Sequence, residues 1–330
     1  NEIKKIDSTE LTVYSGKLSE KFLKDFPFKK LSSDLTESES EQIIDEIKPD
    51  MIITATGGGR AEQELRNIAF RENIKSIVVL DFWKDYKRRW KYASYKLNEM
   101  KDIVCVMDEL TKEEMVSDSF PEDKLFVTGH AYLDKLFNSK ESVETEKQGN
   151  GILKENKVDI LFLSQPLSII GVVDYKIHPL ETCIQAVSEL KEFDGKKLSL
   201  KIKPHPIESE LDEISILLKK FSSKKIEISI TEVDEDLNKL IGEADIVIGY
   251  NTIAMFEARA MNKRTISLNV VPVRNSLSKA MYSAGIEITD CSIEEIKNCL
   301  KLKKEIKSDS KLFAGGIENC IKLVKSELNL

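Results

Sequence analysis

The sequence lacks the patterns that mark several large classes of protein. Its five cysteines include no Cys-x-x-Cys pair, which argues against a zinc site or a disulfide framework and favours reduced thiols in or near a core. No stretch approaches the roughly 18 to 20 apolar residues that span a bilayer, and no signal peptide is recognisable. We therefore expect a cytoplasmic protein.

Common cofactor fingerprints are also missing. The chain contains neither GxGxxG followed by a ribose-binding acid nor GxxxxGK[ST], so it gives little support to NAD binding or to a P-loop. Its three histidines are not clustered, and we expect neither a metal ion nor a cofactor. The formal net charge of −7 gives no reason to expect a nucleic-acid partner.

The order of expected strands and helices predicts an α/β protein with two domains. At 330 residues the chain exceeds the usual size of a single core. We assign residues 1–137 to a first Rossmann-like domain, 138–156 to a polar linker, 157–315 to a second Rossmann-like domain facing the first across a cleft, and 316–330 to a helix that returns to the first. The first domain opens without the usual strand and glycine loop, so we expect that strand to be missing from the chain.

A βαβ unit in the first half carries a triple glycine. The expected strand 50–56 runs into Gly57, Gly58, Gly59 and Arg60, and a strand at 76–80 later ends at Asp81. Glycines permit close approach of a ligand to the backbone, so this loop is a candidate for contacting an acceptor or a phosphate. A plain tight turn explains the glycines equally well.

Three turns in the second half follow expected strands and carry polar residues. They are Ser164-Gln165-Pro166, Lys203-Pro204-His205-Pro206 and Gly249-Tyr250-Asn251-Thr252. The carboxyl ends of parallel strands share one edge of a sheet, so these side chains can converge on a ligand. The last turn opens a helix that Thr252 can cap, and helix amides there favour a phosphate, although an ordinary capped helix is the alternative.

One segment combines basic and aromatic residues. Lysines and arginines alternate with tryptophans and tyrosines between Trp83 and Tyr92. Such a helix could contact an anionic acceptor or the inner face of a membrane peripherally. We favour a solvated helix whose aromatic side chains turn inward.

The three turns and the Phe256-Glu257-Ala258 sequence resemble the nucleotide-binding half of GT-B glycosyltransferases. The Gln-Pro and His-Pro pairs are especially similar to bacterial capsule-type transferases that use CMP-activated sugars such as Kdo or sialic-acid-like donors. The resemblance implies that the donor phosphate is held by His205, Lys203, Asn251 and Thr252, beside Ser164 and Gly249. It places Gln165 and Glu257 near the nucleotide or sugar. The segment from Thr128 to Asp134 resembles the TGxxxxD sequence of GT-B enzymes and sugar-nucleotide epimerases.

A transferase that inverts the sugar needs a carboxylate to deprotonate the acceptor hydroxyl. Asp81 is the candidate base, with Glu62 behind it, and His205 is a candidate for contacting the leaving group. Asp81 could equally cap a helix that begins at Phe82 and Trp83. The acidic motif of the capsule-type enzymes is not recognisable.

Three functions remain open from the sequence. The first is a metal-independent glycosyltransferase that moves a sugar, such as a CMP-linked ulosonic acid, from a nucleotide-sugar donor to a glycan, lipid or protein acceptor in cell-surface polysaccharide synthesis. The second is an enzyme resembling UDP-N-acetylglucosamine 2-epimerases, whose TGxxxxD segment fits although their Ser-Gly-Gly turn does not. The third is a catalytically silent nucleotide-sugar binder, and a homo-oligomer is compatible with all three.

Overall fold

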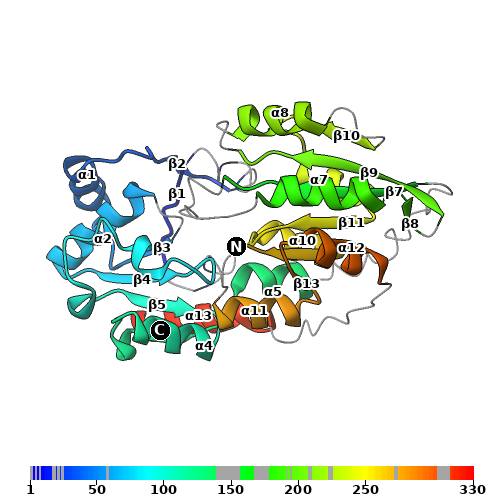
Figure 1. Ribbon diagram of the computed structural model, residues 1–330. Coiled ribbons are helices and arrows are strands. Elements are labelled where there is room, and N and C mark those ends of the chain that lie inside the picture. Colours follow the sequence, from blue (N-terminus) through cyan, green and yellow to red (C-terminus); the bar gives the residue numbers. More distant parts are fainter. Residues whose placement is uncertain are drawn as a thin grey trace. The chain divides into compact units, whose positions relative to one another are not determined.

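The structure is a computed structural model of residues 1–330. It describes residues 3, 6, 9–16, 20, 23, 26–56, 59–138, 157–166, 178–190, 192–193, 195–206, 210–221, 226–270, 274–302 and 313–330. Two compact units divide the chain: Asn1–Lys135 with Phe313–Leu330, and Leu136–Leu312. Both are α/β units built on parallel sheets (Figure 1). None of the described helices has the length and apolar content that crossing a membrane requires.

The first unit is built on a four-stranded parallel sheet with the order β3-β4-β5-β6. These strands are Met51–Ala55, Lys75–Val79, Ile103–Val106 and Leu125–Val127. A two-stranded parallel pair precedes them: β1 (Tyr14–Ser15) and β2 (Lys29–Lys30). The helices up to residue 138 are α1 (Glu37–Ile47), α2 (Arg60–Glu72), α3 (Tyr86–Arg89), α4 (Glu109–Ser117) and α5 (Ala131–Asn138), with 3-10 turns at Leu97–Glu99 and Glu122–Lys124.

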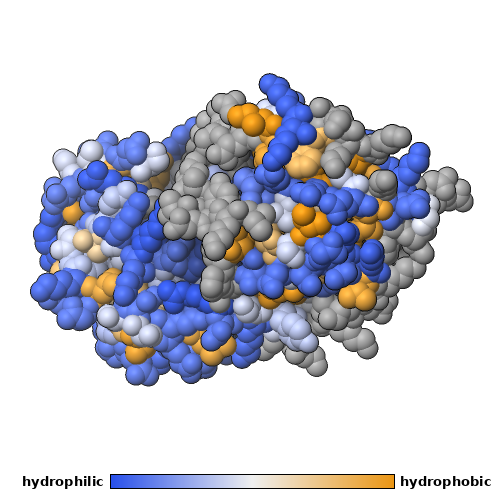
Figure 2. All heavy atoms as spheres, viewed as in Figure 1, coloured by the Kyte–Doolittle hydropathy of each residue, from blue (hydrophilic) through white to orange (hydrophobic). Residues whose placement is uncertain are grey.

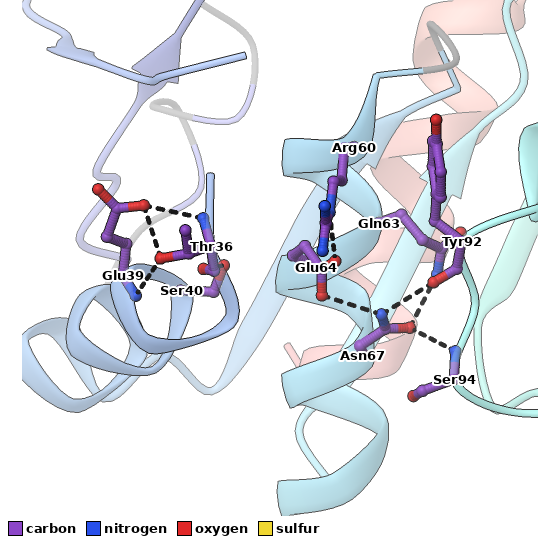
Figure 3. Close-up of polar contacts among 9 residues, drawn as sticks. All are labelled: Thr36, Glu39, Ser40, Arg60, Gln63, Glu64, Asn67, Tyr92 and Ser94. Atoms are coloured by element: carbon purple, nitrogen blue, oxygen red, sulfur yellow. Dashed lines mark hydrogen bonds and ion pairs between the residues drawn. The ribbon is translucent and has the colours of Figure 1, made fainter. Parts of the chain in front are cut away.

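A capping box fixes the start of α1 (Figure 3). The Thr36 hydroxyl accepts a hydrogen bond from the Glu39 N–H, and the Glu39 carboxylate accepts one from the Thr36 N–H. Two of the helix-end donors are satisfied in this way, which is typical of a stable helix start.

The C-terminal helix α13 (Gly316–Leu328) belongs to the first unit. Its Val324 lies in an apolar cluster with Ile77 of β4 and Cys105 of β5. Its N-terminal end is held by the TGxxxxD segment, because the Asp134 carboxylate accepts from the Ile317 N–H at 3.0 Å. The TGxxxxD segment therefore stabilises the position of α13.

Backbone packing at the start of α13 is tight. The Asn319 side chain donates to the Thr128 carbonyl at 3.1 Å. A Cβ added at Gly316 would lie 2.8 Å from the carbonyl carbon of His130 and 3.0 Å from the Ala131 nitrogen. Only glycine fits this contact without a backbone shift.

The second unit has a sheet with the order β10-β9-β7-β11-β12-β13, in which all these neighbours are parallel. The strands are β7 (Lys157–Leu163), β9 (Lys196–Lys203), β10 (Glu227–Ile230), β11 (Ile246–Gly249), β12 (Arg264–Asn269) and β13 (Glu287–Asp290). The helices are α7 (Pro179–Leu190), α8 (Glu210–Phe221), α9 (Leu237–Glu243), α10 (Ile253–Ala260), α11 (Asn275–Ser283) and α12 (Ile293–Lys301). Its core joins Phe162, Leu200, Ile248 and Ile266 from the central strands to Ile184 of α7.

One strand of this sheet departs from the parallel pattern. Strand β8 (Glu192–Phe193) follows α7 and pairs antiparallel with the start of β9. Helix α7 ends at Leu190, so Phe193 belongs to β8 and not to the helix. The turn at Gly195, with a φ of 73°, reverses the chain between the two strands.

Gly316→Ala tests the tight contact of α13. The added methyl would meet backbone atoms, which cannot move aside as a flexible side chain can, so we expect a loss of about 1 to 3 kcal/mol in the free energy of unfolding. Thermal unfolding followed by calorimetry measures it. Gly16→Ala is the control in the same unit, because its nearest neighbour would be the Leu31 oxygen at 3.9 Å. Equal stability of both variants would contradict the contact.

Candidate functional site

Polar side chains follow the strands of the first unit. Thr56 comes after β3, Asp81 after β4, Asp108 after β5 and His130 after β6. Because the four strands are parallel, these residues lie at one edge of the sheet.

Asp81 is fixed by two partners. Its Oδ1 accepts a hydrogen bond from the Thr56 hydroxyl at 2.8 Å and pairs with Nη1 of Arg89. The Asp81 side chain remains 47% exposed, whereas that of Arg89 is only 11% exposed. Asp81 is therefore a held carboxylate that solvent or a ligand can reach. It does not cap a helix at Phe82, because α3 begins at Tyr86.

The basic aromatic segment is folded with its rings inward. Trp83, Tyr86 and Trp90 are between 0% and 3% exposed, and only Tyr92 remains at the surface. These three rings are packed in the core, so they are not available for the membrane contact considered for this segment. The favoured alternative, aromatic side chains turned inward, is confirmed for these three rings.

The glycine loop is only partly visible. Gly57 and Gly58 lie outside the described residues, and Gly59 is the residue before α2. Arg60 lies along α2, where its Nε donates to the Glu64 carboxylate at 2.9 Å (Figure 3). This hydrogen bond is the main reason that its pKa is raised. Glu62 is half-buried in the first turn of the same helix.

His130 links two strand ends. The Leu133 N–H donates to its Nδ1 at 3.4 Å, which leaves the proton on Nε2, 3.1 Å from the Asp81 carbonyl oxygen. The ring is 6% exposed and packs on Trp83, with ring centroids 5.1 Å apart. Burial lowers the His130 pKa, so the ring is neutral in this position. His130 belongs to the TGxxxxD segment, and nothing in the sequence pattern indicated these contacts.

The three predicted turns of the second unit follow the neighbouring strands β9, β7 and β11. The Ser164 N–H, after β7, donates to the Lys203 carbonyl at 3.0 Å, so two of the turns are joined directly. Ser164 and Gln165 line a small hollow together with Tyr250, which precedes Asn251. These turns therefore gather at one edge of the sheet.

Asn251 has an unusual environment at the start of α10. Its φ of 39° is left-handed, and the residue is only 6% exposed. Among the described residues, its Oδ1 is buried without a hydrogen-bond partner. Such an atom costs about 1 to 3 kcal/mol if it stays unpaired, which makes it a candidate for contacting a ligand.

The helix start beside Asn251 is not capped by the Thr252 side chain. Thr252 occupies the N-cap position, but its side chain makes no capping hydrogen bond, contrary to the prediction. At Gly249 a Cβ would lie 3.2 Å from the Leu163 Cβ, so glycine allows β11 to pack closely on β7. Glu257 lies half-buried in the second turn of α10.

Lys203 and His205 differ in what they can offer. The Lys203 ammonium is buried and donates to the Val233 carbonyl at 2.6 Å and to the Pro204 carbonyl at 3.2 Å. A contact to phosphate would have to compete with these carbonyls, so Lys203 mainly ties the ends of β9 and β10 together. Burial, and then the charge of Lys203, lower the His205 pKa. His205 is half-buried at this edge.

Acidic side chains do not gather into a metal site within the described part of the chain. No group of three or more histidine, cysteine, aspartate or glutamate residues has a suitable arrangement there. Asp234, Glu235 and Asp236 have the Asp-x-Asp form of some metal-binding loops, but the Asp236 carboxylate accepts from the Lys239 N–H and caps α9.

Comparison with known proteins identifies the fold. No protein-family model and no curated sequence matches the chain. Among solved structures, the UDP-GlcNAc 2-epimerase from Neisseria meningitidis bound to UDP-GlcNAc is similar with a TM-score of 0.68 and 15% identity, over 100% of this chain and 94% of that one. The UDP-GlcNAc 2-epimerase from Methanocaldococcus jannaschii gives 0.64 and 16%, over 98% and 94%.

A third structure carries a different name. The HepE protein from Anabaena in complex with UDP and glucose gives a TM-score of 0.58 and 12% identity, over 95% of this chain and 87% of that one. At such identities the likeness establishes the fold alone. The chain has a GT-B-like fold of two Rossmann-like units, as predicted from the sequence.

His130 makes the stability of the first unit depend on pH. Its folded pKa is lowered from the ordinary 6.5, so the unfolded chain binds the proton more readily. The stability from the neutral ring is present above about pH 6.5 and is lost as pH falls, by up to about 1.4 kcal/mol per pH unit. Urea unfolding between pH 8 and 5 measures this. The His130→Asn variant keeps an acceptor for the Leu133 N–H but cannot titrate, so its free energy of unfolding should fall less between pH 8 and 5. The same pH dependence in the variant and the wild type would show that His130 is not the group responsible.

Proposed function

We propose that this protein is an enzyme that acts on a UDP-activated sugar. In this proposal the second unit binds the nucleotide at the start of α10, and the Asp81 carboxylate of the first unit moves a proton of the substrate. The observation that carries the proposal is the buried Oδ1 of Asn251, which has no hydrogen-bond partner within the described part of the chain and lies beside a helix start that the Thr252 side chain does not cap.

The chemistry of a sugar nucleotide suits this helix start. Its phosphates would accept from the N-terminal amides of α10, where the helix dipole favours negative charge. Its hydroxyls could donate to the Oδ1 of Asn251, and the Nδ2 of the same carboxamide could donate to a phosphate. A neutral His205 could contribute a further hydrogen bond to the leaving phosphate.

The similar structures favour uridine as the base. UDP or UDP-GlcNAc is named in the complexes of the Neisseria epimerase and of HepE, whereas no CMP complex is among the similar structures described above. A transferase of CMP-linked ulosonic acids is the second candidate, since the Ser-Gln-Pro and Lys-Pro-His-Pro turns are similar to those of the capsule-type enzymes.

Two reactions could use Asp81 as a base in this position. In 2-epimerisation, a base removes a proton from one face of the sugar carbon and an acid returns one to the other face. In glycosyl transfer, a base takes the proton of an acceptor hydroxyl on a glycan, lipid or protein. We place epimerisation first, because the Neisseria and Methanocaldococcus proteins are named for it.

Calorimetric titration with UDP, CMP, CDP and GDP tests the ligand. We expect UDP to bind most tightly and Asn251→Ala to weaken its binding about 10- to 100-fold, the effect of losing one or two buried hydrogen bonds. Asn262→Ala is a matched control, because Asn262 is also left-handed, with a φ of 58°, but is exposed beyond the other end of α10. Tightest binding of CMP would favour the ulosonic-acid transferase, and equal effects of the two variants would remove Asn251 from the site.

His205→Ala tests the leaving-group contact separately. We expect UDP to bind about 10- to 100-fold more weakly than to the wild type, and uridine without phosphates to bind both proteins alike. The same calorimetric titration, run with both ligands, provides the comparison. If the variant folds and keeps its full affinity for UDP, His205 does not contact the phosphates.

A further inference from the structure

Within the described residues, the Asp81 carboxylate is held through one of its two oxygens. The Thr56 hydroxyl and Arg89 Nη1 both contact Oδ1, and Oδ2 has no partner among the described residues. The carboxylate is therefore fixed on one side and open on the other. With the Asp81 side chain 47% exposed, Oδ2 is the oxygen that can receive a proton from a substrate.

The Arg89 side chain is itself immobilised. Its Nη1 also donates to the Thr56 carbonyl at 2.6 Å and to the Thr56 hydroxyl at 2.9 Å, and its Nε donates to the Lys84 carbonyl at 3.0 Å. An exposed ion pair has little effect because both side chains move freely. Here the guanidinium is 11% exposed and bound at two nitrogens, so it forms a rigid support.

Helix α2 anchors the backbone that carries Arg89. The guanidinium of Arg66, which is 2% exposed, lies over the Trp90 ring at 5.0 Å from its centroid, and its Nη2 contacts the Arg89 carbonyl at 3.4 Å. Trp90 in turn donates to the buried Asp102 carboxylate at 3.1 Å.

A second set of contacts continues this anchor toward Tyr92. Asn67 of α2 donates to the Tyr92 carbonyl at 3.0 Å and accepts from the Ser94 N–H at 3.0 Å (Figure 3). Side chains of α2 thus contact this segment at Arg89, Trp90, Tyr92 and Ser94. These contacts hold the backbone of the basic aromatic segment, and with it Arg89, in one position.

We propose that Arg89 is a positioning residue for the Asp81 base, and this inference rests on the proposed function. Arg89 holds Oδ1 so that Oδ2 keeps a single direction toward the substrate proton. A base that is already oriented does not lose rotational freedom in the reaction, and a misplacement of about 1 Å can reduce turnover about 100-fold. Lysine cannot reproduce the contacts, because one ammonium does not offer the planar fork of arginine.

A double-mutant cycle tests the proposal on the full chain. Turnover of UDP-GlcNAc in D2O is followed by proton NMR, which detects both UDP release and loss of the sugar C2 proton, and UDP affinity is measured by calorimetry. The proteins are the wild type, Asp81→Asn, Arg89→Ala, Arg89→Lys, the double variant Asp81→Asn with Arg89→Ala, and Arg88→Ala. Arg88 is the matched control, because it is the exposed arginine next to Arg89 in α3.

We expect Asp81→Asn to lower kcat about 100- to 10,000-fold, the usual contribution of a general base. Arg89→Ala should lower kcat about 10- to 100-fold, and Arg89→Lys should restore only part of it, with KM and UDP affinity nearly unchanged. In the double variant, the loss should equal that of Asp81→Asn alone, because Arg89 acts only through Asp81.

The outcomes separate two failures. If Asp81→Asn lowers kcat but Arg89→Ala does not, Arg89 does not position the base, although the proposed function stands. The conclusion is the same if the double variant loses the full effects of both single variants. The same conclusion holds if Arg88→Ala matches Arg89→Ala, or if Arg89→Ala mainly raises KM. A wild type without turnover, or an Asp81→Asn variant with normal turnover, overturns the proposed base and the inference with it.

Discussion

Parallel pairing of neighbouring strands decides where the candidate residues of both units lie. A parallel sheet brings the carboxyl ends of its strands to one edge, so loops far apart in sequence become neighbours. In the first unit this pairing brings Thr56 to Asp81 across 25 residues of sequence. In the second it joins Ser164 to Lys203 and places Asn251 after the adjoining strand. The candidate sites are consequences of the sheets, supplemented by side chains that hold each loop in one conformation.

The succession of strands along the chain and the polar turns that follow them could be predicted from the sequence, because both follow from local patterns. Buried β-branched runs indicate parallel strands, and the residues after them must lie at the sheet edge. The contacts of Arg89 and His130 could not be predicted, since they depend on which side chain meets which strand end. Lys203 illustrates the same limit: its charge suggested a phosphate contact, but the fold directs it to the Val233 carbonyl. Thr252 has the residue type and position of a cap without the bond.

The preference for a UDP sugar over a CMP sugar comes from the fold comparison and not from the motifs. A turn as short as Ser-Gln-Pro does not specify which nucleotide base a site would bind. TGxxxxD is similarly general, because here its Asp134 binds the N-terminus of α13. Under the proposed function, a transferase and an epimerase would differ in the group that presents its proton to the Asp81 carboxylate.

A crystal structure of the complex with UDP tests the central claim most directly. We expect the phosphates at the start of α10, with ligand atoms within hydrogen-bonding distance of the Asn251 carboxamide and of His205. The Oδ1 of Asn251, which has no partner among the residues that the structure describes, should then have a donor on the ligand. A nucleotide bound elsewhere, or a complex in which the Asn251 carboxamide still contacts no ligand atom, would contradict the account.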